Sequence, residues 1–370
     1  MIEGTDWGEL EHAYGPAENT PLRPVQLLDE DPEVQSWALT MLGMSVLHQD
    51  SLYSATAPAA LYVAGVLDDT RTLTVHENNS VLADHPWPLR AALLECLGRI
   101  ADSAAYGETT DEDGGDDQVA TDAARTVCAP GLDVVLPHLL ALEPAVREAA
   151  LGAVAMFLQS PDLTGRTGTA TRLLSRLLAE STDRRERAAI VLTIGFWGHH
   201  TTSSLTDPDP AVRACAALTP ALADNPDATR VMLDALGEPT TVDSWFSGPT
   251  SIDPWDGRPL PHIEGRLRHA LLTAAIDRVT SFEELLPTAT AFAPLCSNLT
   301  IADDWGPLLA AAFPRKHHPG AELTPAQHTY LSALVERDVC WRCTHLIASW
   351  FEDVGLPPDR EAVRALLSGP

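Results

Sequence analysis

The stretch EPAVREAALGAVAMFL, residues 143–158, decides how this chain folds. A glutamate precedes a proline, and Val146 and Arg147 then open a run of small and apolar residues. Proline is tolerated in the first turn of a helix, where its missing N–H would have no helical partner, and an acidic residue favours the same end. The stretch therefore predicts a helix that begins at residue 144.

One face of this predicted helix is apolar. Four small side chains recur on it at helical spacing: Val146, Ala149, Ala150 and Val154. Alanine and glycine elsewhere in the stretch allow a second helix to approach closely. Because one helix cannot bury this face alone, a packed partner is expected, and the apolar segment at 132–142 supplies it.

The same pattern recurs along the chain. Aligned on the Arg147 position, its copies fall at Gln35, Arg90, Arg147, Arg187, Arg213 and Arg268. A helix, a short acidic turn and a proline-led helix resemble the HEAT repeat. The resemblance implies an all-α fold, an α-solenoid of antiparallel helix pairs whose second helices line a concave surface. At this position arginine is expected to pair with the acidic turn of its own or the next repeat, which we favour over a ligand contact.

The spacing of the copies predicts an irregular array. Only the 40 residues between Arg147 and Arg187 match the ~40–47 residues of a HEAT unit. The short step from Arg187 to Arg213 predicts that the first helix of that pair is nearly missing between Gly198 and Asp207. We expect one continuous solenoid over 1–370. Its irregular parts are a lead-in at 1–20, an acidic flexible loop at 107–122, a Pro/Trp-rich loop at 238–262 and a degenerate helical end at 263–370.

No metal or cofactor is expected. In the acidic run, Asp111, Asp113 and Asp122 match three positions of a calcium-binding loop, but Asp116 stands where that loop needs glycine, so a solvated loop is favoured. Adjacent His199 and His200 point apart on a helix. The CWRCTH segment at 340–345 lacks a second ligand pair, so its cysteines are interpreted as buried thiols.

The charge of the chain restricts its partners. It carries 52 acidic and 24 basic residues, a formal net charge of −28. Such a chain repels phosphate backbones, so nucleic-acid binding is disfavoured, whereas a basic protein is favoured. No apolar run is long enough to cross a membrane, and the first ten residues lack the apolar core of a secretory leader. We therefore expect a cytoplasmic location, and the Arg-rich, Lys-poor composition is typical of a GC-rich bacterial genome.

The leading hypothesis is a non-enzymatic protein that binds another protein on its concave face, as a scaffold or as an inhibitor of the immunity type. No P-loop, nucleophile elbow, dinucleotide fingerprint or HExxH motif occurs. This absence is weak evidence against an enzyme, because helical enzymes often carry scattered catalytic residues. Two alternatives stay open. One is a HEAT-like lyase or isomerase that handles a small molecule, and the other is a HEAT-like DNA-repair glycosylase.

Candidate binding residues are aromatic or lie at a helix junction. They are His48, Tyr53, Trp87, Trp197, Trp245 and Trp255. His48 and Tyr53 belong to the segment at 37–67, which resembles the opening of a group of bacterial HEAT-repeat proteins. Large aromatic side chains dominate binding surfaces when exposed, but in a helical stack they also fill the core. The junction residues, with Thr56, could equally cap helix ends.

Overall fold

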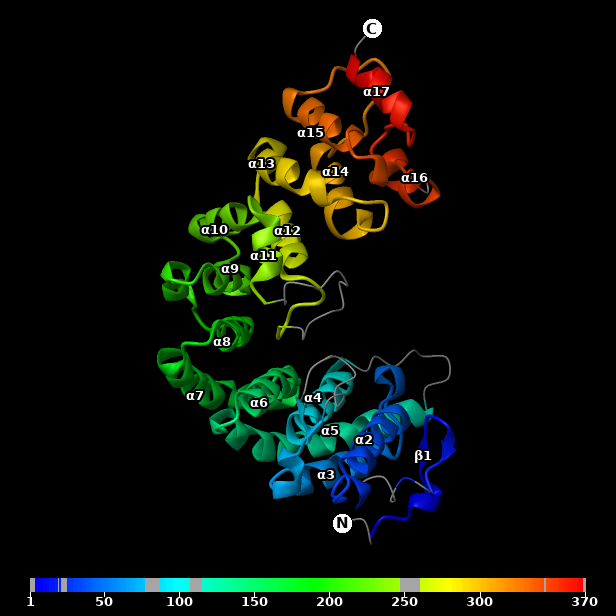
Figure 1. The fold of residues 1–370 in the computed structure, drawn as a ribbon, viewed down its shortest axis with the longest axis vertical. Helices are drawn as coiled ribbons and strands as arrows, with labels where there is room; N and C mark the ends of the chain where they lie inside the picture. The colour runs from blue at the N-terminus through cyan, green and yellow to red at the C-terminus, as the bar shows by residue number, and fades with distance from the viewer. Residues whose placement is uncertain are drawn as a thin grey trace. The chain divides into compact units, whose positions relative to one another are not determined.

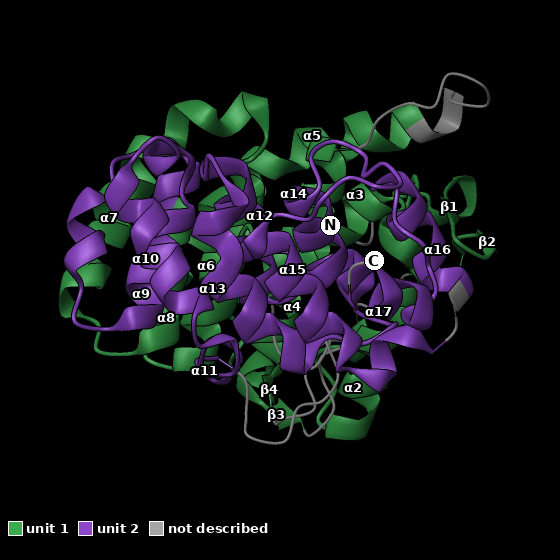
Figure 2. Ribbon diagram, turned by 90° about the horizontal axis from the view of Figure 1, so that it is seen from above, with its two compact units in different colours: residues 1–193, 255–262 green, residues 194–254, 263–370 purple. Residues whose placement is uncertain are grey.

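The computed structural model describes residues 4–18, 20, 25–76, 87–106, 115–246, 260–342 and 344–368 (Figure 1). Trp255, Cys343, the acidic residues at 107–114 and most of the Pro/Trp-rich loop lie outside the described residues. The described part is mostly helical and divides into two compact units, coloured separately in Figure 2. Unit 1 comprises residues 1–193 and 255–262, and unit 2 comprises 194–254 and 263–370. A single continuous array was expected.

Unit 1 consists of helices joined by short 3-10 turns. Its α-helices are α2 (Pro32–Val46), α3 (Thr56–Val66), α4 (Leu89–Tyr106), α5 (Gly115–Val135), α6 (Pro144–Phe157), α7 (Thr167–Glu180) and most of α8 (Arg184–Phe196). The 3-10 turns are η2 (Trp7–Glu9), η3 (His48–Asp50), η4 (Thr70–Leu73), η5 (Leu136–Leu140) and η6 (Pro161–Arg166).

Two small antiparallel hairpins modify the all-α prediction. In the first, β1 (Glu11–His12) pairs with β2 (Gly15–Pro16) inside the predicted lead-in. In the second, β3 (Val75–His76) pairs with β4 (Trp87–Pro88) just before α4. Each strand has two residues, so the hairpins fix the path of the chain between helices without forming a layer.

The helix predicted from the opening stretch is confirmed. α6 begins at Pro144, and its predicted apolar face is buried. α6 packs closely against α4. A Cβ added at Gly98 of α4 would lie only 2.8 Å from the Cα of Ala153 in α6. The acidic run differs from the prediction, since α5 begins at Gly115 and residues 115–122 are helical. Acidic side chains near a helix N-terminus are favoured by its dipole, which explains the extension.

Unit 2 continues with shorter helices. They are α9 (Pro210–Leu218), α10 (Pro226–Leu236), α11 (Pro239–Ser244), α12 (Leu267–Arg278), α13 (Phe282–Phe292), α14 (Gly306–Ala312), α15 (Pro325–Val335), α16 (Thr344–Asp353) and α17 (Arg360–Ser368). Its short turns are η7 (Thr202–Thr206), η8 (Pro220–Leu222), η9 (Ala293–Leu295), η11 (Asp338–Trp341) and the π-helical turn η10 (Ile301–Trp305). Between Gly198 and Asp207 only η7 forms, as predicted. α11 occupies the start of the predicted 238–262 loop.

Side chains at the Arg147 position tie the start of a helix to the segment before it. Four of them donate to the carbonyl six residues upstream: Gln35 to Asp29 at 2.8 Å, Arg147 to Ala141 at 2.9 Å, Arg187 to Ser181 at 3.1 Å and Arg213 to Asp207 at 2.6 Å. Arg147 also bonds Glu186 of the following pair at 2.8 Å. These side chains are engaged within the fold, and Arg147 pairs with a carboxylate as expected, but the bonds to the preceding segment go to its backbone carbonyls instead of to its acidic side chains.

Among the described residues, no helix combines the length and the apolar character needed to cross a bilayer.

Candidate functional site

The candidate binding residues do not form one cluster. His48, Tyr53 and Trp87 lie in unit 1, whereas Trp197 and Trp245 lie in unit 2. Trp87 is buried in the core, which is the alternative that the sequence left open for tryptophan. Trp197 and Trp245 are half-buried at the ends of α8 and α11. The junction near His48 adjoins an exposed apolar surface that includes Trp37 and Met44.

The junction between α2 and α3 is held by hydrogen bonds to helix ends. The Thr56 hydroxyl donates to the carbonyl of Val46 at 2.6 Å and accepts from the backbone N–H of Tyr53 at 2.8 Å. Gln49 and Asp50 both have positive φ, at 53° and 59°, so the turn is strained for non-glycine residues. Arg99 bonds Asp50 at 2.6 Å and holds this turn against α4. Thr56 therefore satisfies a carbonyl at the end of α2, which is part of the capping that was the structural alternative, whereas α3 begins without a side-chain cap.

Beside this junction, α2 exposes an uncharged face. We define the α2 face as Tyr14, Trp37, Met41, Met44 and His48. Trp37 is 46% exposed and Met44 is 44% exposed, while the opposite side of α2 is buried. The backbone N–H of Ala13 donates to the carbonyl of Ser45 at 3.0 Å, which places the first hairpin at the end of α2. The ring of Tyr14 then lies 5.6 Å from that of His48. The side chain of Tyr14 is 57% exposed.

The composition of α2 is unusual for an exposed helix. Residues 34–47 include no ionisable side chain, although charged residues make up 21% of the chain. Four acidic residues are exposed at the start of the helix: Asp29, Glu30, Asp31 and Glu33. Asp31 caps the helix by accepting from the N–H of Glu33 at 2.9 Å. The α2 face is thus an apolar surface with negative charge at one end, a combination typical of a protein-binding surface.

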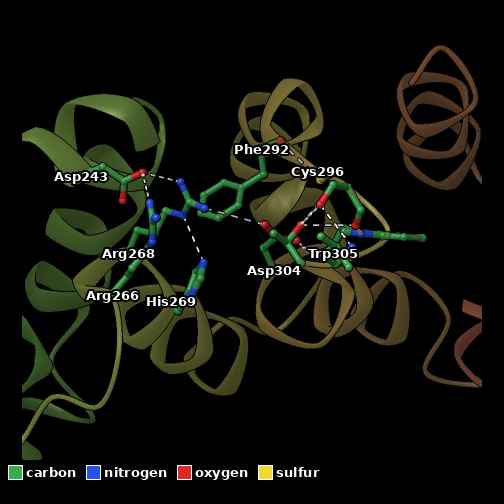
Figure 3. A network of polar contacts seen from close by, with 11 residues as sticks. Asp243, Arg266, Arg268, His269, Phe292, Cys296, Asp304 and Trp305 are labelled. Carbon is green, nitrogen blue, oxygen red and sulfur yellow. Dashed lines mark hydrogen bonds and ion pairs between the residues drawn. The ribbon is translucent and has the colours of Figure 1, made fainter. Parts of the chain in front are cut away.

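A second polar cluster is buried in unit 2 (Figure 3). Arg268 of α12 forms an ion pair with Asp243 of α11, and its other nitrogen lies 4.0 Å from Oδ2 of Asp304 in the π-helical turn. Arg266 joins Asp243 at 3.3 Å. The guanidinium of Arg268 also lies 5.9 Å from the centre of the Phe292 ring. The cluster therefore connects α11, α12, α13 and the π-helical turn.

Burial governs the protonation of this cluster. It raises the pKa of Asp304 to about 6, against the lowering effects of the Trp305 backbone N–H at 2.6 Å and of Arg268. It lowers the pKa of His269 to about 4, and the nearby charges of Arg268 and Arg266 act in the same direction. Asp304 is completely buried and Arg268 almost so. Opposite charges that are paired and sealed in this way fit a structural role better than a catalytic one.

Sequence reasoning missed both Asp304 and the α2 face as a unit. Arg268 was recognised as a copy of the Arg147 position, but its partner comes from α11 instead of the preceding turn, and no spacing rule predicts that. For α2 a signal was present, because a helix whose outward positions carry no charge stands out in an acidic chain.

An apolar pocket lies between α3, α4, α5 and α6, lined by Ala60, Leu61, Ala64, Leu97, Ile100, Ala101, Val127, Cys128, Gly131 and Phe157. Ligand sites normally add a few placed polar groups that orient the ligand. This lining offers a single thiol, so it provides little for recognising a substrate. Among the described residues, no three His, Cys, Asp or Glu side chains are grouped to hold a metal ion.

No protein family matches the chain, and comparison with characterised proteins finds no match.

Proposed function

We propose that this protein is a non-enzymatic binding protein that holds a basic, amphipathic segment of another protein on the α2 face. Its helix pairs would belong to an irregular HEAT-like α-solenoid, supported by the recurring bond from the Arg147 position to the segment before each helix. Covering a basic surface of its partner would make the protein a scaffold or an inhibitor of the immunity type.

The observation that carries the proposal is the exposed, uncharged face of α2. Burying a tryptophan and two methionines against a partner removes apolar surface from water, at about 25 cal/mol per Å². Tryptophan is also the residue most enriched among those that dominate binding energies, and methionine adapts its shape to different partners. A helix laid along α2 would contact Trp37, Met41 and Met44 through residues spaced at i, i+4 and i+7.

Charge selects a basic partner for this face. Three arginines among the described residues of unit 1 are engaged within the unit: Arg71 with Asp69 and the Leu28 carbonyl, Arg90 with Thr72 and the Asp69 carbonyl, and Arg99 with Asp50. In this proposal the exposed carboxylates at the start of α2 attract cations of the partner. A lysine or arginine placed there would gain up to about 1 kcal/mol per exposed pair, together with a faster encounter at low salt.

The test is a binding titration with a defined probe. A synthetic amphipathic helix of about 20 residues, with leucine on one face and lysine at one end, is titrated into the full chain at ~50 and ~500 mM salt. We expect binding that Trp37→Glu together with Met44→Glu weakens at least about 10-fold. High salt should weaken it several-fold.

The matched control is Leu142→Glu, because Leu142 is also in unit 1 and is 89% exposed but lies outside the α2 face. It adds a negative charge to an exposed apolar position and should leave the affinity unchanged. Equal loss in the control and the double variant, or no binding of the probe at either salt concentration, would reject the proposal. An affinity pull-down from the native cytoplasm, run with the same variants, would then identify the natural partner.

A further inference from the structure

Two buried thiols lie together beside the cluster of unit 2. Cys296, directly after η9, and Cys340, in η11, are 1% and 0% exposed, and each thiol is the strongest influence on the pKa of the other. The backbone N–H of Asn298 donates to the carbonyl of Val339 at 3.2 Å. This bond holds the two cysteine segments side by side independently of the thiols.

The two thiols are not equivalent. The thiol of Cys296 reaches the Phe292 carbonyl at 3.3 Å. It has one hydrogen, so it can serve that carbonyl or Cys340 at any one time. The hydrogen bond from Cys296, with smaller contributions from the charges of Arg337 and Arg360, lowers the pKa of Cys340 despite its burial. The same bond and burial raise the pKa of Cys296. Cys340 is therefore the thiol that ionises first.

We propose that Cys296 and Cys340 are a peroxide-oxidised thiol pair that closes to a reversible disulfide within unit 2. This inference is independent of the proposed binding function, since none of its residues belongs to the α2 face. Because both sulfurs are buried, the oxidant must be small, and hydrogen peroxide is the class that fits.

The reaction balances in two steps. The Cys340 thiolate attacks one oxygen of hydrogen peroxide, the O–O bond breaks, and hydroxide leaves, which gives a sulfenic acid at Cys340. The sulfur of Cys296 then attacks the Cys340 sulfur, the S–S bond forms, the S–O bond breaks, and the hydroxide takes the proton of Cys296. Two thiols and one peroxide become one disulfide and two waters. A dithiol reductant reverses the change by thiol–disulfide exchange.

The surroundings give the reaction a readout. The indole N–H of Trp305 donates to the carbonyl of Ser297 at 2.7 Å, next to Cys296, and the hydroxyl of Tyr330 donates to the carbonyl of Trp305 at 2.9 Å. Figure 3 labels Trp305 beside Asp304, with Cys296 above it in this view. A disulfide that draws Cys296 toward Cys340 would therefore shift the environment of Trp305 and change its fluorescence.

Other buried cysteines provide an internal comparison. Burial raises the pKa of Cys96 and of Cys128 to about 11, and neither has a thiol neighbour among its hydrogen-bond partners or its electrostatic neighbours. Both should stay reduced at peroxide concentrations that link Cys296 to Cys340, because the thiolate is the reactive form.

The experiment treats the full chain with a small excess of hydrogen peroxide and maps cysteines by mass spectrometry without reduction. We expect a linked peptide pair that contains Cys296 and Cys340, lighter by two hydrogen atoms, and restored by a dithiol. Cys296→Ser should leave a sulfenic acid on Cys340, which a 1,3-dione added during unfolding traps, because the folded chain buries this sulfur. Cys340→Ser should leave Cys296 unmodified. Cys340→Ala replaces the serine variant if circular dichroism shows that the latter is unfolded.

The background variant is Cys343→Ser, which removes the other thiol of the Cys340–Cys343 motif. The link must persist there, with the same change in Trp305 fluorescence. A link between Cys340 and Cys343 in the natural chain, or oxidation of Cys128 as fast as that of Cys340, would overturn the inference. So would complete resistance of Cys296 and Cys340 to peroxide.

Discussion

Arginine serves in this chain as a connector of helix ends. Arg147 donates to the carbonyls of Ala141 and Leu142, which lie in the turn before its own helix, and to the carboxylate of Glu186 in the next pair. Its guanidinium presents several N–H groups in a fixed fork, so one side chain can satisfy two carbonyls and a carboxylate together. A single residue thus links the turn before α6, α6 itself and α8.

Removing this connector should destabilise the fold. We expect Arg147→Ala to lower the free energy of unfolding by about 2–4 kcal/mol, because the half-buried Ala141 carbonyl and Glu186 lose a charged donor. Arg147→Lys should recover only part of the loss, since an ammonium cannot reproduce the fork. Urea denaturation followed by circular dichroism measures both.

Arg230 is the matched control for that measurement. It forms an i, i+3 pair with Asp227, and both side chains are more than 60% exposed. Arg230→Ala should change the free energy of unfolding by less than about 0.5 kcal/mol. A loss as large as that of Arg147→Ala would mean that any arginine, rather than the connecting position, sets stability.

Asp304 gives a pH dependence of known sign. Its folded pKa of about 6 exceeds the ordinary value of 3.8, so between these values the folded state binds more protons than the unfolded state. Its contribution is fully present below about pH 4 and is lost as the pH rises through 6. The difference of about two pKa units means that Asp304 lowers the free energy of unfolding at pH 7 by on the order of 3 kcal/mol.

Asp304→Asn isolates this contribution. Relative to the natural chain, the variant should gain stability as the pH rises from ~4 to ~7, by up to about 3 kcal/mol. The depressed pKa of His269 acts oppositely, since its contribution is lost as the pH falls below its ordinary 6.5 toward 4. Comparing two chains that share His269 removes that effect. Parallel stability curves over this pH range would contradict the prediction.

At the scale of the elements, helix starts could be predicted from the sequence. Proline after an acidic or capping residue marks the starts of α2, α6, α9 and α10, and each begins at that proline. The early start of α5 was not predicted, because its charge pattern also fits a loop. The π-helical turn at 301–305 was not predicted either. It depends on burying Asp304 beside Arg268, a contact between residues 36 positions apart.

The contact between α4 and α6 depends on a missing side chain. A Cβ at Gly98 would lie 2.8 Å from the Cα of Ala153, so Gly98→Ala must push the two helices apart. We expect a loss of about 1–3 kcal/mol in the free energy of unfolding. Thermal unfolding measured by circular dichroism would show it as a lower Tm.

Gly152, one residue away from that contact on α6, is the matched glycine. A Cβ there meets nothing within 4 Å. Gly152→Ala should therefore stabilise the helix by about 0.5–1 kcal/mol, because alanine loses less backbone entropy on folding. If both glycine variants shift Tm in the same direction, close approach of α4 and α6 is not what requires Gly98.

At the scale of the whole molecule, the net charge was the most informative property of the sequence. The position of the binding site was the feature that the sequence predicted least well. The count of acidic residues predicted a basic partner class, but not where it would bind. His48 was chosen for its place at a helix junction, whereas Tyr14 was not among the candidate binding residues. The bond from Ala13 to Ser45 brings them together. The buried Trp87 shows the converse, since an aromatic residue cannot be assigned to core or surface from its type alone.

The net charge of −28 should itself limit the stability of the fold. Many arginines are held in internal bonds, so exposed carboxylates repel one another with little local compensation, and added salt screens that repulsion. We expect Tm to rise by about 2–5 °C between ~20 and ~500 mM NaCl. KCl should give the same shift, because screening depends on ionic strength and not on the identity of the cation. A fall in Tm would show instead that the internal arginine pairs, which salt also weakens, contribute more to stability than the surface repulsion costs.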